Sequence, residues 1–184
     1  MLHVPALPGT YQHKLSISQI IEHVLAETQI YASAGLDAVM LENMHDLPYL
    51  RGQAGPEIVA SLTAVASAVK AAYPLPCGLQ VLAAANREAL AIALATGMEF
   101  IRVENYIYSH VADEGIMNSC AGDLKRYQKQ IGAENVLIFT DLQKKHSSHA
   151  LTSDLDLTTW AETAEFFLSD GLIITGTKTG EAPS

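Results

Sequence analysis

The chain has 184 residues, of which 49% are hydrophobic and 17% are charged, and its formal net charge is −9. This apolar content excludes an intrinsically disordered chain and is sufficient for one core, so we expect a single domain over residues 1–184. The acidic balance argues against nucleic-acid binding, which needs clustered lysine and arginine to meet phosphates.

One pattern recurs along the chain: a helical stretch, then a glycine, then a short apolar strand. Residues 17–34 carry apolar side chains at helical spacing, and Gly35 ends this helix before the strand LDAVMLEN. Pro56 suits the first turn of the next helix, because its missing N–H has no helical partner there. The strand CGLQVL, from Cys77, follows that helix.

Three more units continue the pattern. We expect Asn86 to cap the first of their helices, and Thr159 and Glu162 to form a capping box at the start of the last. The helices cover 87–96, 123–131 and 159–168, and the strands begin near Met98, Asn135 and Leu172. A first strand is represented by its tail at Leu2–Val4.

The short, branched, apolar strands predict a parallel sheet covered on both faces. A doubly wound sheet is the natural rival, but its glycine-rich phosphate loop does not match HVPALPGTYQHK after the first strand. Polar residues instead follow the end of every strand, as in barrels that build a site from many strand ends. The predicted fold is α/β, an incomplete TIM-type (β/α) barrel with about six parallel strands.

Long segments of the chain resemble the BtpA family. They are HVPALPG (3–9), LENMHDLPY (41–49), GPE (55–57), QVLAAANREALAIA (80–93), FIRVEN (100–105), DEG (113–115), AGDLKRYQKQIGAENV (121–136), KKHSSHA (144–150) and SDGLIITGTKTG (169–180). The resemblance implies a TIM-type barrel of the ribulose-phosphate-binding kind. It also implies a role like that of the best-described members, the accumulation of photosystem I proteins in cyanobacteria, while other members are described only loosely, some as possible enzymes.

Family members look longer at both ends, so we expect strands seven and eight to be missing here. The chain would then be a fragment, a splice product or an incorrectly predicted gene model. Two parallel sheet edges and an apolar interior would be exposed, which favours aggregation. A second copy or a protein partner would be needed to cover the open edge.

Arg102 and Glu104 end one strand and point to the same side of it. They can act together as a substrate clamp, with the guanidinium binding an anionic oxygen and the carboxylate acting as a base. The alternative is a structural ion pair that plugs the barrel. Asn105 is the next polar residue at this strand end.

Glu42 and Asn43 end another strand and could bind a metal ion or a sugar hydroxyl, whereas capping of the following loop is the alternative and is favoured for Asp46. His3 could join them across the barrel mouth or could be a packed residue satisfied by a backbone bond. Gln80 is a candidate hydrogen-bonding group that points inward.

The segment from Asp141 to His149 is the richest in functional side chains. Asp141 is expected to face the barrel mouth, Lys144 and Lys145 could hold phosphate, and His146 could act as an acid, a base or a metal ligand. A solvated basic loop is the alternative. A hydroxyl- and glycine-rich loop follows the last strand, and its N–H groups could bind an anion or the loop could be frayed: Thr175, Gly176 and Thr177.

Two functions remain open. One is a small-molecule site for a phosphorylated or sugar-like ligand, of unknown reaction, cofactor and metal; the catalytic candidates are Glu42, Arg102, Glu104, Asp141 and His146. The other is a non-catalytic assembly factor for a protein complex. No apolar stretch is long enough to insert into a membrane, which predicts a cytoplasmic protein, or a mitochondrial one if an N-terminal extension is missing. The stretch 106–120 could be a lid or a packed excursion.

Overall fold

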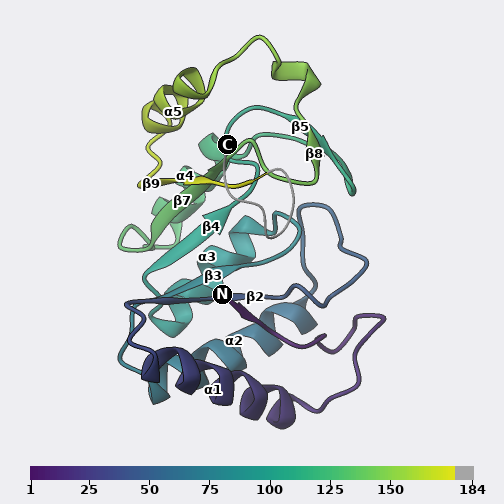
Figure 1. Ribbon diagram of the computed structural model, residues 1–184, viewed down its shortest axis with the longest axis vertical. Coiled ribbons are helices and arrows are strands. Elements are labelled where there is room, and N and C mark those ends of the chain that lie inside the picture. The colour runs from purple at the N-terminus through teal and green to yellow at the C-terminus, as the bar shows by residue number, and fades with distance from the viewer. Residues whose placement is uncertain (177–184) are drawn as a thin grey trace.

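The computed structural model describes residues 1–176, through which one curved sheet of six parallel strands runs (Figure 1). The strands follow one another in the order β1-β2-β3-β4-β7-β9. Their bounds are β1 (Leu2–His3), β2 (Val39–Glu42), β3 (Cys77–Gln80), β4 (Phe100–Val103), β7 (Leu137–Leu142) and β9 (Gly171–Ile174).

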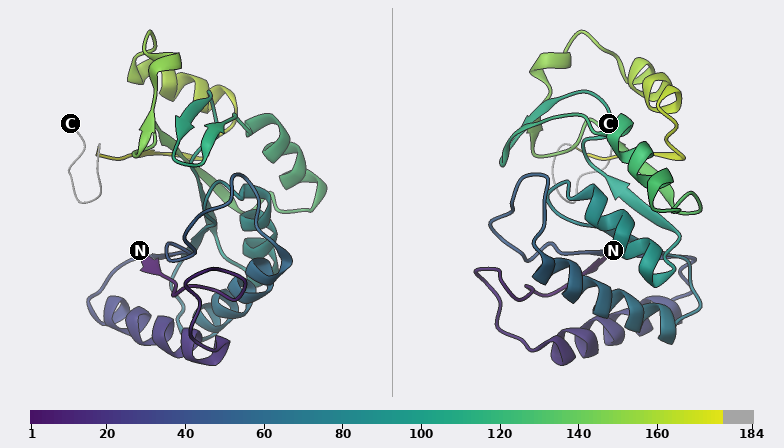
Figure 2. Two further views of the ribbon diagram at one scale, coloured as in Figure 1. Left: turned by 90° about the vertical axis from the view of Figure 1, so that its right-hand side faces the viewer. Right: turned by 180° about the vertical axis from the view of Figure 1, so that it is seen from behind.

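The helices that connect these strands lie on the outer, convex side of the sheet (Figure 2, left). They are α1 (Ile17–Ser33), α2 (Pro56–Ala72), α3 (Asn86–Thr96), α4 (Ala121–Gln130) and α5 (Leu157–Phe166). A doubly wound sheet has helices on both faces, so this arrangement excludes it. The predicted α/β fold with a parallel six-stranded sheet is confirmed, and it is consistent with part of a TIM-type barrel.

The two faces of the sheet are buried to different degrees. In β2, Val39 and Leu41 are buried against the helices, whereas Met40 and Glu42 on the concave side are half-buried. β4 alternates in the same way. The expectation that the strands are covered on both faces therefore holds for β3, which is buried throughout, but is wrong for β2 and β4, whose concave side is open.

Large and small side chains alternate on the concave face below the strand ends. The rings of Phe100 and Phe139 stack with their centroids 5.3 Å apart. Gly78 pairs with Phe100 and Gly171 pairs with Phe139 across the neighbouring strands. A Cβ atom at Gly78 would lie 2.0 Å from the Phe100 ring, so glycine is what admits the phenyl group. This layer forms the floor beneath Arg102 and Asp141, which follow on the same faces of β4 and β7.

Two helix starts differ from the expected ones. Asn86 is the first residue of α3, not its cap, and its side chain bonds to Asn105 instead. The cap of α5 is Asp156, whose carboxylate accepts a hydrogen bond of 2.8 Å from the backbone N–H of Thr159. Asp156 lies three residues before Thr159, which is the spacing an N-cap requires.

The stretch 106–120 is a packed excursion with its own strands. β5 (His110–Ala112) and β6 (Gly115–Met117) form an antiparallel hairpin, and β8 (Ser147–Ser148) pairs with β5 on its other side. A 3-10 turn (Ala150–Thr152) follows β8. The small sheet joins the loop after β4 to the loop after β7, so the two loops form one unit at the carboxyl ends of the strands.

The end strands of the main sheet are β1 and β9. Leu172 and Ile174, on the side of β9 that faces away from the concave surface, are 45% and 52% exposed. Phe166 and Leu168, just before β9, are exposed as well. An apolar surface therefore surrounds this edge of the described chain.

Candidate functional site

Arg102 and Asp141 form a bidentate ion pair between adjacent strands. The guanidinium of Arg102 donates from Nε and Nη2 to the two carboxylate oxygens of Asp141, at 2.9 and 3.0 Å. The side chains are 11% and 1% exposed. Burial raises the pKa of the Asp141 carboxyl, and the Arg102 pair opposes that shift. The expected Arg102–Glu104 pair is therefore replaced by a cross-strand pair.

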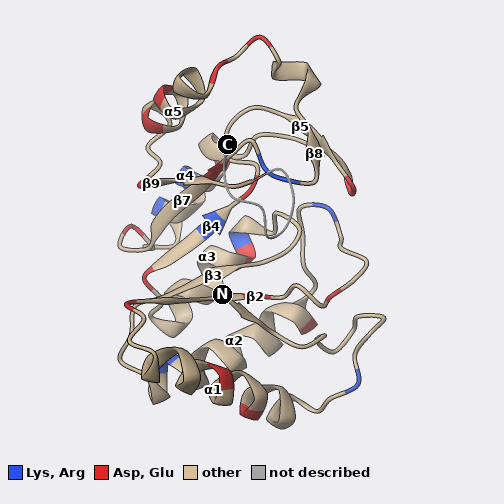
Figure 3. Ribbon diagram, viewed as in Figure 1, with Lys and Arg blue, Asp and Glu red and all other residues tan. Residues whose placement is uncertain are grey.

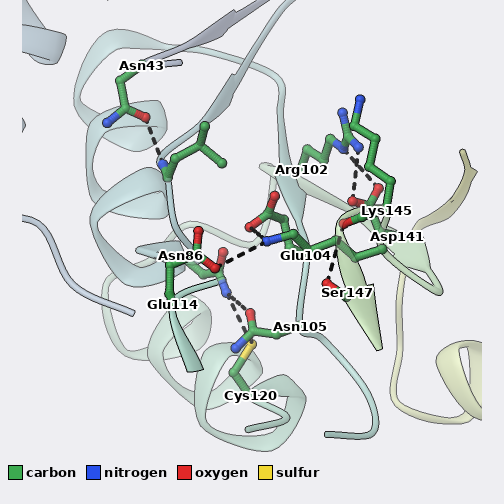
Figure 4. A network of polar contacts seen from close by, with 12 residues as sticks. Asn43, Asn86, Arg102, Glu104, Asn105, Glu114, Cys120, Asp141, Lys145 and Ser147 are labelled. Carbon is green, nitrogen blue, oxygen red and sulfur yellow. Dashed lines mark hydrogen bonds and ion pairs between the residues drawn. The ribbon is translucent and has the colours of Figure 1, made fainter. Parts of the chain in front are cut away.

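Glu104 instead contacts a lysine from the loop after β7. The Nζ atom of Lys144 lies 3.3 Å from Oε2 of Glu104 and 3.8 Å from Oε2 of Glu114, which belongs to the β5–β6 turn. All three side chains are at most 10% exposed. Figure 4 shows Glu104 and Glu114 approaching each other from separate segments of the chain.

The Glu104 carboxyl group has a strongly shifted pKa. Burial raises its pKa to about 7, because the charged form loses hydration. Lys144 opposes the shift and the nearby Asp141 adds to it. Glu104 can therefore hold or release a proton near neutral pH.

His3 and Glu42 face each other at the ends of β1 and β2. The two residues are paired in the register of the strands, and Nε2 of His3 lies 3.3 Å from Oε2 of Glu42. The His3 side chain is 43% exposed, while that of Glu42 is 12% exposed.

These side chains surround one cavity of about 470 Å³ at the carboxyl ends of the strands. Eight of the residues predicted from the sequence line it: His3, Glu42, Arg102, Glu104, Asp141, Lys144, Lys145 and His146. Further lining comes from Met1, Met44, His45, Leu47, Tyr49, Leu82, Asp113 and Glu114. The strand ends thus converge on a common rim and are not scattered over an open sheet.

Asn43 and Asp46 form a structural bridge. Asn43 accepts a hydrogen bond from the backbone N–H of Leu82 and donates one to Asp46. Asp46 in turn accepts a hydrogen bond of 2.8 Å from the backbone N–H of Leu7. The two side chains therefore tie three loops together, which agrees with the loop-capping alternative.

Asn105 belongs to a separate buried network beside the cavity (Figure 4). Its Oδ1 accepts a hydrogen bond of 2.7 Å from Asn86, and its amide donates to the carbonyl of Asn118. Asn86 also donates to the sulfur of Cys120. Burial raises the pKa of the Cys120 thiol to about 12, so this group is not a ready nucleophile.

The remaining predicted ligand-binding residues lie away from the cavity lining. Gln80 is buried, and its Oε1 has no hydrogen-bond partner among the described residues. Thr175 and Gly176 follow β9 and do not line this cavity. Thr177 lies outside the described residues.

Sequence reasoning missed Glu114, Asp113 and Tyr49. Asp113 and Glu114 follow the short β5 strand, and the pairing of that strand with β6 and β8 brings Glu114 to Lys144. The signal in the sequence was the DEG turn within an unusually long connection.

A buried aromatic cluster supports the Lys144 loop from behind. Nε2 of His149 lies 2.9 Å from the carbonyl oxygen of Lys144, so this nitrogen carries the proton. The His149 ring lies 5.3 Å from that of His110 and 5.7 Å from that of Trp160, centroid to centroid. Burial lowers the pKa of His110 to about 4, which keeps its imidazole neutral near pH 7.

Charge and metal-binding groups elsewhere do not indicate a second site. Figure 3 shows the basic residues scattered over many elements. Within residues 1–176, no group of three histidine, cysteine or acidic side chains is placed to hold a metal ion. In the same part of the chain, no helix combines the length and the apolar character that crossing a membrane requires.

Comparison with known proteins gives a consistent result. The model of the BtpA family matches residues 1–184. An uncharacterized mitochondrial protein of Caenorhabditis elegans is 50% identical over 189 residues, which cover 100% of this chain and 68% of the worm protein. An uncharacterized protein of Archaeoglobus fulgidus is 34% identical, over 98% of this chain and 70% of its own length. The photosystem I biogenesis protein BtpA of Synechocystis is 29% identical, over 100% of this chain and 63% of its own length.

Proposed function

The chain belongs to the BtpA family, and we propose that it binds a small phosphorylated or sugar-like ligand in the cavity at the strand ends. The observation that carries this proposal is Glu104, a buried carboxyl group with a pKa of about 7 that faces Lys144 inside the cavity. A group that exchanges its proton near neutral pH is suited to general acid–base chemistry.

The eight lining residues that were predicted from the sequence each have a role in this proposal. Glu104 takes or gives a proton, and Arg102 orients the ligand. Glu42, Asp141 and His146 are further catalytic candidates, and His3, Lys144 and Lys145 bind the ligand. Asn43 and Asn105 are left out, because their side chains are engaged in structural hydrogen bonds.

Titration calorimetry with a panel of sugars, sugar phosphates and nucleotides tests this proposal. We expect Arg102→Ala to weaken the binding of the best ligand by about tenfold or more, since bonds to charged groups contribute about 1.5–3 kcal/mol. Glu104→Gln keeps the shape of the side chain and removes its proton exchange, so turnover is expected to fall more than binding does. Lys129→Ala, at an exposed site in α4, is the matched control. A complete absence of binding across the panel would end the proposal.

The name of the Synechocystis relative favours a second candidate, a non-catalytic factor in the assembly of a protein complex. Such a factor acts through its surface. Arg102→Ala and Glu104→Gln would then still restore a strain that lacks the gene, whereas a site in the cavity requires both variants to fail. Complementation therefore separates the two functions.

We also propose that the six strands are part of an eight-stranded barrel. The sequential strand order, the helices on one side and the outer edges of β1 and β9, which pair with no strand within residues 1–176, support this. The C. elegans relative is named as mitochondrial, which supports that location as an alternative to the cytoplasm. Imaging of a fluorescent fusion would distinguish the two compartments.

A further inference from the structure

The basic groups of the cavity are already neutralised by carboxylates. Arg102 is held by both oxygens of Asp141, and Lys144 lies between Glu104 and Glu114. These side chains are almost completely buried, so the pairs are poorly screened by water. An incoming anion would have to compete with a carboxylate at Arg102 and at Lys144.

The charges that line the cavity have a negative balance. With the lining histidines His3, His45 and His146 counted as neutral, five carboxylates stand against three charged basic side chains, namely Glu42, Glu104, Asp113, Glu114 and Asp141 against Arg102, Lys144 and Lys145. Lys145 also offsets the charge of Asp141. A phosphate ester brings a further charge of about −1.5 to −2 near neutral pH, so its binding here is opposed by repulsion.

The cavity also has buried hydrogen-bond acceptors that are poorly matched by donors. The Oε2 atoms of Glu104 and Glu114 are buried and share one ammonium group, that of Lys144, at 3.3 and 3.8 Å, so neither oxygen has a well-formed hydrogen bond within residues 1–176. A buried acceptor without a donor costs free energy that a donating ligand recovers. Hydroxyl groups can donate to these oxygens, whereas a fully ionised phosphate can only accept.

Part of the lining is apolar. Met44, Leu47, Tyr49 and Leu82 lie around the same cavity as the carboxylates. The C–H faces of a sugar ring can pack against such groups while its hydroxyls reach the acidic side. The volume of about 470 Å³ lies within the range of small-ligand pockets.

From these contacts we infer that the ligand is an uncharged polyhydroxy compound of the size of a sugar, and not its phosphate ester. Hydroxyl groups donate to Glu104 and Glu114, and the ring lies toward Tyr49. This inference rests on the proposed small-molecule function and narrows it to one ligand class.

The test compares matched pairs of ligands on the full chain at pH 8, where histidine as a class is uncharged. Saturation-transfer NMR and calorimetry measure binding of ribose against ribose 5-phosphate, and of glucose against glucose 6-phosphate. We expect at least one free sugar to bind about tenfold or more tightly than its phosphate ester. Glu114→Gln, which frees Lys144 from one carboxylate, is expected to narrow or reverse this preference. Glu134→Gln removes an exposed carboxylate far from the cavity and is expected to leave the preference unchanged.

The outcomes separate this inference from the function on which it rests. Tighter binding of a phosphate ester, lost in Arg102→Ala, overturns the inference and leaves a small-molecule site in place. Binding of neither member of any pair, or binding that Arg102→Ala and Glu114→Gln both leave unchanged, overturns the two together. Circular dichroism of each variant is the control that tests whether the fold is retained.

Discussion

Glu104 is held where ionisation is costly, and this has a consequence for stability. Its pKa rises from an ordinary value of 4.5 to about 7, so the folded chain binds this proton more tightly than the unfolded chain does. Stability from this group is complete below pH 4.5 and is lost as the pH rises through 7.

Glu104→Gln is therefore expected to remove a pH dependence. In the wild-type chain this group lowers the free energy of unfolding by about 3 kcal/mol between pH 4.5 and 7, and the glutamine variant lacks that decline. Urea denaturation at a series of pH values measures the difference. If the free energy of unfolding changes with pH equally in both proteins, Glu104 does not have the raised pKa.

The pKa shift of His110 makes stability depend on pH in the opposite direction. Its pKa is lowered to about 4 by burial, so the unfolded chain takes up a proton at a higher pH than the folded chain does. The stability from this group is present above pH 6.5 and is lost as the pH falls toward 4. We expect His110→Phe to flatten the acid side of the stability profile in the same denaturation experiment, while Glu104→Gln leaves that side unchanged.

The Arg102–Asp141 pair predicts an asymmetry between single and double substitutions. Removing either partner leaves a buried charge alone, so Arg102→Ala is expected to lower the free energy of unfolding by about 3–5 kcal/mol. Arg102→Met with Asp141→Leu removes both charges and is expected to cost less than the sum of the single changes. The exposed Lys129–Glu134 pair is the comparison, and Lys129→Ala should hardly move the denaturation midpoint.

The alternation of side chains along a strand was enough to predict that Arg102, Glu104 and Asp141 share one side of the sheet. The choice of partners was not readable, because it depends on the register between β4 and β7 and on the path of the loop that carries Lys144. Asn43 shows the same limit, since only the folded loops reveal its bond to the N–H of Leu82. Whether the lining residues act together on a ligand stays a prediction.

At the scale of elements, the recurring helix–glycine–strand pattern located the helices and the parallel strands well. The β5–β6 hairpin was not predicted, because strands of three residues have too little sequence to show a period. The predicted N-cap of α5, Thr159, is wrong by three residues. Asp156 and Thr159 are both good caps, and the choice between them depends on the turn that precedes the helix.

The floor of the cavity gives a prediction for the sheet. Gly78→Ala puts a methyl group against the Phe100 ring. We expect this overpacking to lower the free energy of unfolding by about 1–3 kcal/mol. Phe100→Leu in the same chain should recover part of that loss. Gly122→Ala, in α4 beside a flexible arginine, is the control, since alanine favours a helix. Thermal unfolding of the four proteins measures these effects.

At the scale of the whole molecule, the sheet curves but its end strands do not meet within the described residues. The strand patterns of the sequence predicted about six parallel strands, and the described sheet has six. The sequence could not predict how exposed the side chains of β9 are. Their exposure depends on which of them face the side of the sheet that no described helix covers. Leu172 and Ile174 are those residues.

The outer edge of β9, which pairs with no strand among residues 1–176, predicts self-association of this chain. An unpaired strand with exposed apolar side chains is a template for pairing with another chain. Size-exclusion chromatography with light scattering is expected to give dimers or larger species, and Leu172→Lys with Ile174→Lys to shift the chain toward monomer. A lysine at Leu151, which is exposed far from this edge in sequence, is the control. A stable wild-type monomer would contradict the prediction.

The hairpin that carries Glu114 contributes to the cavity without belonging to the main sheet. Arg102, Glu104 and Asp141 are placed by strands whose backbones are fixed on both sides, whereas the acidic turn between β5 and β6 is joined to them only through Lys144. Ligand preference can therefore change by exchange of one short turn while the scaffold keeps its sequence. A graft of a differently charged turn between Ala112 and Gly115 is expected to alter what the cavity accepts and to leave the strands of the main sheet as they are.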